Sequence, residues 1–175
     1  MTLLWHDGVD AGPDPDVQAY LAGDDVRLDR HLFQFDIAGT IAHVRGLAQI
    51  GLLTGDDETR LVDALEDLRA RAGAGVFVLD ERFEDGHSAI ETDLAEQLGD
   101  LGRRVHVGRS RNDQVLTAMR LWMLDVVAGL RADTLRAARA CLARARGDAM
   151  TPMPGYTHLP VSYTHLTLPT NGCVV

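Results

Sequence analysis

Lysine is absent from this chain of 175 residues, and all 17 of its basic residues are arginine. The absence excludes, within this stretch, a lysine Schiff base and the lysine of a phosphate-binding P-loop. There are two cysteines, Cys141 and Cys173, which form neither a metal-ligand spacing nor a disulfide framework. Aromatic residues make up only 5% of the chain, while alanine and leucine are abundant, and this balance favours helices.

Positive charge and long apolar runs are also scarce. The net charge of −9 and the pI of about 5.1 argue against a general nucleic-acid binder, which needs a basic surface. No apolar run approaches the roughly 18 residues that would span a membrane, so no membrane association is expected. The segment 1–16 contains aspartate and no arginine, unlike a signal or transit peptide, and we expect a cytoplasmic protein.

The rest of the composition is that of a globular protein. Hydrophobic residues make up 46% of the chain, the mean hydropathy is −0.07, and the length suffices for one domain with a hydrophobic core. No alternation of helix and strand patterns supports a parallel sheet, and only the segment 76–79 could be a short strand or simply extended chain. We therefore predict an all-α fold.

Apolar spacing predicts two helices joined by a short turn. The first follows an irregular arm over roughly the first 30 residues, and Gly51 is well placed to end it. Thr54 is a candidate N-cap for the second helix, whose acidic first turn suits the helix dipole and which runs to Gly73. The apolar stripes of the two helices are Ile37, Ile41, Val44 and Ala48, and Leu61, Leu65, Leu68 and Ala72.

A third, short helix is expected to end at Gly99. Ser88 and Glu91 have the spacing of a capping box near its start. A loop is expected from residue 100 to residue 108. The apolar positions of this helix are Ile90, Leu94 and Leu98.

The strongest structural feature is a stretch without proline from Asn112 to Ala149. A helix of about 35 residues would be about 50 Å long, which is typical of a long bundle helix rather than of a compact domain. Pro152 and Pro154 follow the stretch and would stop the helix. The apolar stripe that we expect to be core is Val115, Met119, Trp122, Val126 and Leu130.

Three segments carry candidate chemistry: 84–91, 105–114 and 153–159. The second presents arginine, serine and asparagine side chains just after Gly108, at the N-terminus of the long helix, where unpaired N–H groups and the dipole attract anions. On composition alone the plainer interpretation, an N-cap loop with two solvated arginines, is the favoured one. Asp113 then serves as a first-turn partner of the helix dipole.

Two histidines are candidates for acid–base work at neutral pH. His158 follows Thr157 just after a Pro-Gly turn, and His87 lies near the start of the third helix. Each has a plainer interpretation as well. His158 could be a packed or hydrogen-bonded turn residue, and His87 a residue of the first helical turn.

Taken in order, these segments resemble the argininosuccinate lyases, a family of the fumarase/aspartase superfamily. Residues 106–115 are similar to the family signature HTGRSRNDQV, and residues 153–159 are similar to the start of MPGYTHLQ. Residues 84–91 are similar to ED-V/I-H-xx-IE, and residues 28–43 to DRxL…DIxGSxAH. The ordered matches over residues 28–159 make the resemblance specific.

The resemblance implies a β-elimination that splits argininosuccinate into arginine and fumarate, carried out by a homotetramer built on a long-helix bundle. It also implies that the chemistry needs no metal and no organic cofactor. His158 matches the acid–base histidine of the family. The residues that match substrate-binding or other active-site positions of the family are Ser110, Arg111, Asn112, Thr157 and His87.

On this resemblance, residues 1–111 are expected to form an N-terminal helical domain that carries part of the active site, and residues 112–159 to begin the central bundle. Residues 160–175 are expected to be a non-native tail, because the Tyr-Thr-His-Leu of 156–159 recurs at 163–166. The family's mobile loop GSSxMPxKxNP, with its catalytic serine, is missing from the sequence, which therefore looks truncated.

Some departures from the family leave alternatives open. Val107 stands where the family has threonine, and Pro160 where it has glutamine. Another lyase of the superfamily, such as adenylosuccinate lyase or fumarase, would share the helical bundle. A non-catalytic helical protein, either a crystallin-like relative or an inert fragment, is the alternative of a different class. Nucleic-acid binding through the clustered arginines is disfavoured by the acidic total.

Overall fold

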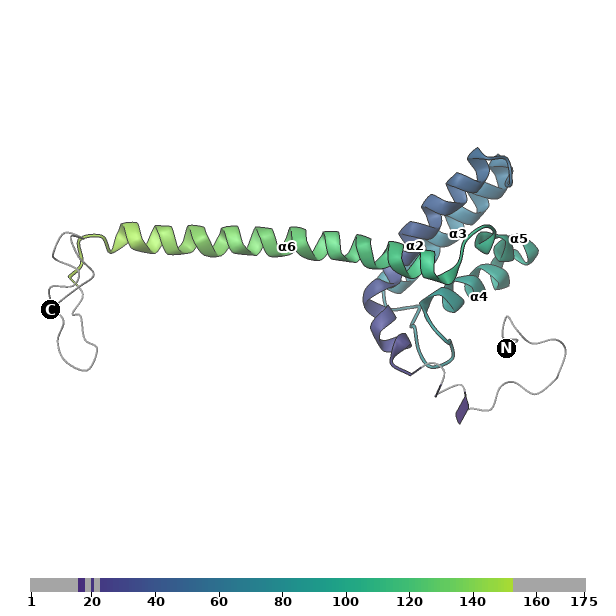
Figure 1. Cartoon of the computed structure of the whole chain (residues 1–175), viewed down its shortest axis with the longest axis horizontal. Helices are drawn as coiled ribbons and strands as arrows, with labels where there is room; N and C mark the ends of the chain where they lie inside the picture. The colour runs from purple at the N-terminus through teal and green to yellow at the C-terminus, as the bar shows by residue number, and fades with distance from the viewer. Residues whose placement is uncertain (1–15, 18–19, 21–22, 153–175) are drawn as a thin grey trace. The chain divides into compact units, whose positions relative to one another are not determined.

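The computed structural model describes residues 16–17, 20 and 23–152. Within that part of the chain every regular element is helical and no strand occurs, which confirms the predicted all-α class (Figure 1). The segment 76–79 is accordingly irregular chain rather than a strand. None of the helices described combines the length and the apolar character that crossing a membrane requires. The chain divides into two compact units, Met1–Ala128 and Gly129–Val175.

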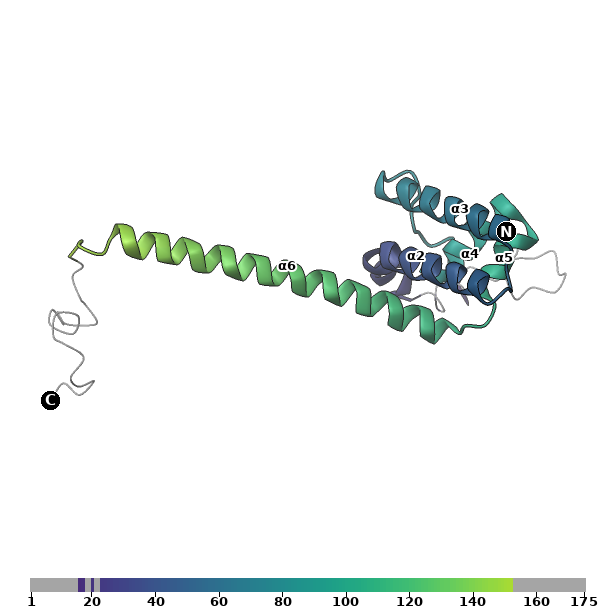
Figure 2. The same ribbon diagram turned by 90° about the horizontal axis from the view of Figure 1, so that it is seen from above.

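The first two helices, α2 (Asp25–Gln49) and α3 (Gly55–Gly73), lie side by side (Figures 1 and 2). Gly51, in the turn between them, has a φ of +78°, a left-handed conformation that glycine adopts without steric cost. Thr54 caps α3 as predicted. Its side chain accepts a hydrogen bond from the Asp57 N–H, and the Asp57 carboxylate accepts one from the Thr54 N–H. The sequence therefore determined this turn and the start of α3.

The α2 helix begins earlier than its apolar pattern predicts. We expected an irregular arm up to about residue 30, but the helix starts at Asp25, and Val26 is already buried. Charged side chains dominate this first part of α2, so the sequence shows no clear apolar helical period there. Tertiary packing can stabilise a helix through few apolar positions, so the arm prediction is wrong over residues 25–30.

The third helix, α4 (Gly86–Leu98), packs against α2 and α3 and ends at Gly99 as predicted. Its capping box is not the expected pair of Ser88 and Glu91. Asp85 accepts a hydrogen bond from the Ser88 N–H, and the Ser88 hydroxyl is paired with the Asp85 backbone. The extended backbone of Asp85 brings its carboxylate over the first turn, whereas Glu91 lies inside the helix.

Two short helical turns occupy most of the expected loop 100–108, α5 (Asp100–Arg103) and η1 (Arg104–His106). This connection lies directly on the backbone of α4. A Cβ atom added to Gly102 would lie 2.2 Å from the carbonyl oxygen of Leu94, so only glycine fits at this contact. The loop prediction is wrong because a non-local contact, invisible in the local pattern, orders the segment.

The core lies between α2, α3 and α4. Three aromatic rings continue it into the connection after α3: Phe33 and Phe77 stack with ring centroids 5.5 Å apart, and Phe77 and Phe83 at 5.8 Å. These contacts hold the irregular chain before α4 against α2 and so fix where α4 begins. The buried apolar residues of the three helices include Ile37, Val44, Leu61, Leu65, Leu68, Ile90 and Leu94.

The long helix is α6 (Arg111–Gly147), close to the predicted bounds. Its buried residues are Gln114 and Ala118, near its start. Part of its apolar stripe is exposed in the described chain: Val126 and Leu130 are 45% and 64% exposed. A helix cannot cover its own stripe, so the stripe could become core only against a partner.

Candidate functional site

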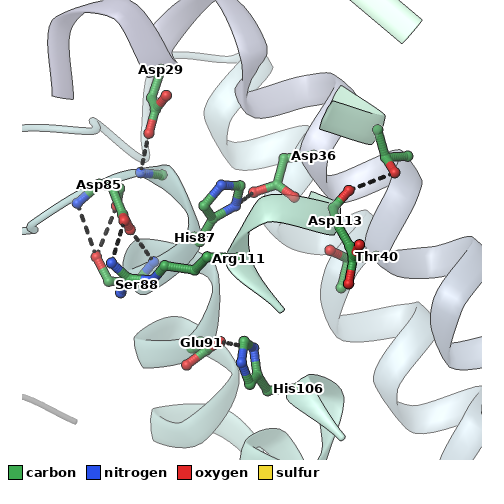
Figure 3. A network of polar contacts seen from close by, with 12 residues as sticks. Asp29, Asp36, Thr40, Asp85, His87, Ser88, Glu91, His106, Arg111 and Asp113 are labelled. Atoms are coloured by element: carbon green, nitrogen blue, oxygen red, sulfur yellow. Dashed lines mark hydrogen bonds and ion pairs between the residues drawn. The ribbon is translucent and has the colours of Figure 1, made fainter. Parts of the chain in front are cut away.

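A network of polar side chains links α2, the N-terminus of α4 and the start of α6, all within the first compact unit (Figure 3). The first turn of α4 is buried from Gly86 to Ile90, which is unusual for a helix end. Helix N-termini carry unpaired N–H groups, so a buried one must find acceptors in the protein or in a ligand. Here the acceptors are aspartates.

His87 and Asp36 form the most buried pair of the network. The His87 Nδ1 contacts the Asp36 carboxylate, and both residues are at most 5% exposed. Burial alone would lower the pKa of His87, but the hydrogen bond and charge of Asp36, with the charges of Asp85 and Asp29, outweigh it and raise the pKa. His87 is therefore biased toward the imidazolium form.

Two further aspartates bind the same end of α4. Asp29 accepts a hydrogen bond of 2.8 Å from the Gly86 N–H. Burial raises the pKa of the Asp29 carboxyl, against the opposing effects of the Gly86 N–H and of the charge on His87. Asp85 caps the helix through Oδ1, and its Oδ2 lies 2.8 Å from the Nη1 of Arg111. Negative charge at this helix end is favoured by the dipole.

A second group lies between the middle of α2 and the start of α6. The Arg109 guanidinium donates to the Thr40 hydroxyl at 3.0 Å, and burial lowers the pKa of Arg109. His43 donates through Nε2 to the carbonyl of Val107 at 2.9 Å, and burial lowers the pKa of His43. The Gln114 side-chain oxygen is buried without a hydrogen-bond partner among the described residues. An open pocket of about 210 Å³ is lined by Asp36, Gly39, His43, Gly108, Arg109, Asp113, Gln114 and Thr117.

The structure brings together some of the predicted site residues. Arg111 is tied to the turn that carries His87, because it pairs with Asp85 and also lies 3.3 Å from Glu84. Ser110 is engaged locally: its N–H and hydroxyl both donate to Asp113, at 3.0 and 3.2 Å. Asp113 thus lies in the first turn of α6, as expected, and accepts hydrogen bonds from the residue that precedes the helix.

Among the described residues, no contact joins Asn112 to the network. Asn112 is exposed in the first turn of α6. Thr157 and His158 lie outside the described residues.

Sequence reasoning missed the roles of Asp36 and Thr40. Both are buried on α2 at positions where its helical period requires apolar residues, next to Ile37 and Ile41. A polar residue inside an apolar stripe must be paired, and that was the signal that could have found them. His106 and Glu91, 2.8 Å apart, lie on separate elements, and no pattern in the sequence indicated that they form a pair.

No group of three or more histidine, cysteine, aspartate or glutamate residues that could hold a metal ion occurs in the part of the chain that the structure describes. In the network, His87 is paired with Asp36, and Arg111 with Asp85. The chemical character of the site is therefore that of fixed donors: the His87 ring and the Arg111 guanidinium are held by carboxylates, and the Arg109 guanidinium by a hydroxyl.

Residues 18–164 match a family model described as Lyase, and the chain belongs to this lyase family. The relatives that it resembles within the family are argininosuccinate lyases. It is 48% identical, over 158 residues, to those of Xylella fastidiosa (strain Temecula1 / ATCC 700964) and Stenotrophomonas maltophilia (strain R551-3). Each alignment covers 90% of this chain and 35% or 36% of the relative. The chain thus spans about a third of the length of the curated relatives it matches, and the family resemblance drawn from its motifs is confirmed.

Proposed function

We propose that this chain is part of an argininosuccinate lyase, which splits argininosuccinate into L-arginine and fumarate in arginine biosynthesis. The observation that carries the proposal is the 48% identity, over 90% of the chain, to proteins of that name. None of the relatives named above is an adenylosuccinate lyase or a fumarase, and no observation favours a non-catalytic role. The activity belongs to the whole protein.

The reaction is a β-elimination. A base removes a proton from the succinyl carbon, the electron pair is held by the adjacent carboxylate, and the bond from carbon to the guanidinium nitrogen then breaks. A proton on that nitrogen completes the arginine product. Because the carbon acid is weak, catalysis depends on fixed donors at the carboxylate where the charge develops. Such donors make a metal or organic cofactor unnecessary.

The proposed substrate-binding groups are the residues at the start of α6 together with His87. Arg111 offers a guanidinium beside the N-terminal turn of α4, and Asn112 offers an exposed amide in the first turn of α6. The Ser110 hydroxyl donates to Asp113 and keeps its lone pairs for a substrate N–H. These groups would bind argininosuccinate by charge-assisted and neutral hydrogen bonds.

His158 is proposed as the acid–base group and Thr157 as its neighbour in substrate binding. Both assignments rest on the match to the family motif alone. Residues 1–111 and 112–159 would form the N-terminal domain and the beginning of the bundle, and 160–175 a non-native tail.

We also propose that the whole protein is a cytoplasmic homotetramer that binds neither nucleic acid nor membranes. Support comes from the exposed apolar side chains of α6, which need a partner to be buried. The net charge of −9 supports the absence of nucleic-acid binding.

The test is the release of fumarate from argininosuccinate by the whole protein, followed by ultraviolet absorbance in the presence of a chelator. We expect full activity without added metal. Adenylosuccinate, offered under the same conditions, is the control for the alternative of an adenylosuccinate lyase and should not be cleaved. Activity lost on chelation and restored by a divalent ion would contradict the cofactor-free mechanism. Cleavage of adenylosuccinate but not of argininosuccinate would contradict the assignment of argininosuccinate as the substrate.

A further inference from the structure

The Asp36–His87 pair has three properties that do not follow from packing alone. Both side chains are buried, yet they come from positions 51 residues apart in the sequence, on α2 and on the first turn of α4. The pair uses only one of the two ring nitrogens. The other, His87 Nε2, is buried and has no hydrogen-bond partner among the described residues.

Burying a polar pair costs desolvation free energy, and leucine or phenylalanine of similar volume would fill the same space without that cost. The presence of the pair therefore indicates a role beyond packing. The α2 stripe shows the contrast: Asp36 stands directly beside Ile37 and Phe33, which pack into the core. A carboxylate on Nδ1 fixes both the orientation and the tautomer of an imidazole, since Nδ1 must then carry the proton.

The charges around His87 determine which form the ring takes. Asp36 and Asp29 face it from α2, and Asp85 faces it from the N-cap of α4. Arg111, from α6, is held by Asp85 and partly offsets that charge. The negative surroundings favour the imidazolium, in which Nε2 is also a donor. A neutral ring would instead present Nε2 as an acceptor, suited to a base.

We propose that Asp36 is a positioning residue: it orients His87 through Nδ1 and keeps the ring as an imidazolium, whose Nε2–H is then a donor for a carboxylate oxygen of the substrate. The proposal rests on the proposed function, because it takes the substrate to be a carboxylate. A cavity of about 10 Å³, lined in part by Asp29, Gly86 and His87, has room for about one water molecule.

The first experiment measures the protonation of His87 without any need for activity. Exchange of the histidine C2 hydrogen with deuterium, followed by mass spectrometry over a pH series, reads each imidazole separately in the full chain. For the wild-type chain we expect the midpoint of His87 to lie above that of an exposed histidine. In Asp36→Asn, which keeps size but removes charge, the midpoint should move to lower pH.

Two variants separate charge from folding. Asp36→Glu retains the carboxylate and should keep the His87 midpoint near its wild-type position. Asp93→Asn removes a different buried aspartate of α4, the partner of Arg71, and should leave the His87 midpoint unchanged. Within each protein, His43 and His106 serve as internal references for an intact fold. A His87 midpoint that stays the same in Asp36→Asn, with these references unchanged, would overturn the proposal.

The second experiment uses the kinetics of the whole protein. Asp36→Asn should remove the His87 donor to the substrate carboxylate. The KM for argininosuccinate should therefore rise by roughly tenfold or more, with a smaller effect on kcat. A fall in kcat at unchanged KM would overturn the donor role and assign Nε2 to proton transfer. If wild-type protein releases no fumarate, the proposed function fails while the exchange result on the Asp36–His87 pair stands.

Discussion

The guanidinium Nη1 of Arg111 lies 2.8 Å from Oδ2 of Asp85, whose other carboxylate oxygen caps α4. One side chain thus joins the first residue of α6 to the turn that carries His87. Two segments that carry candidate chemistry, 84–91 and 105–114, are in this way held together. The arrangement supports the assignment of Arg111 and His87 to one site.

The pairing of Arg111 leads to a prediction on substrate binding. In the whole protein, Arg111→Ala and Asn112→Ala should each lower kcat/KM by about 100-fold, because a charge-assisted contact to a substrate carboxylate is lost. Arg103→Ala is the control: that side chain is exposed, and its pair with Asp100, 3.6 Å apart, contributes little. Steady-state kinetics check the prediction. Small and equal effects of all three substitutions would show that the start of α6 is not an anion site.

A prediction on proton transfer concerns His158. In the whole protein, His158→Asn should lower kcat by about 10²–10⁴-fold with little change in KM, since an acid–base group acts mainly on the chemical step. Thr157→Val should instead raise KM. Both are measured by fumarate release over a pH series. A near-normal kcat with an unchanged pH profile would make His158 a structural turn residue.

The contact of Gly102 with α4 predicts a large effect on stability. In Gly102→Ala the new Cβ would meet the Leu94 carbonyl oxygen at 2.2 Å and the Ala95 nitrogen at 2.7 Å, both of them backbone atoms that cannot rotate away. We expect the free energy of unfolding to fall by about 1–3 kcal/mol or more. Gly46→Ala is the matched control, because nothing lies within 4 Å of its new Cβ in α2. It should stabilise by roughly 0.5–1 kcal/mol. Urea unfolding followed by circular dichroism measures both, and equal effects would refute the contact.

The raised pKa of His87 predicts how stability depends on pH. Because the folded-state pKa lies above the ordinary value of 6.5, the Asp36–His87 interaction contributes in full below about pH 6.5. It is lost as the pH rises through the folded-state pKa. The wild-type advantage in unfolding free energy over Asp36→Asn should therefore shrink with rising pH. Unfolding curves of the two proteins at several pH values measure this difference. The lowered pKa of His43 gives the opposite pH dependence, but it is present in both proteins and largely cancels in the difference. A difference that grows with pH would contradict the assignment.

Self-association through α6 is the last expectation. Val127 and Leu130 are 60% and 64% exposed on this helix, and apolar faces of this kind promote association. The chain should sediment as oligomers or larger aggregates. The double substitution Val127→Glu with Leu130→Glu should reduce this association, whereas Arg131→Glu, which adds negative charge at an exposed polar position, should change it much less. A wild-type chain that sediments as a monomer and unfolds in one sharp transition would count against the expectation.

The sequence by itself determined the helical class, the turn at Gly51, the cap at Thr54 and the bounds of the long helix. These features depend on apolar periodicity and on interactions between residues that are close together in the chain, so a short stretch of sequence is enough to predict them. The family could also be recognised from the sequence, because its motifs are short and contiguous.

Only the tertiary structure decided how the site is built. The buried partnership of Asp36 with His87, the contact of Arg111 with Asp85 and the ordering of residues 100–106 by Gly102 all join segments that are distant in sequence or in separate elements. No period or cap encodes such contacts, because they arise when packing excludes water and each buried charge must then find a partner.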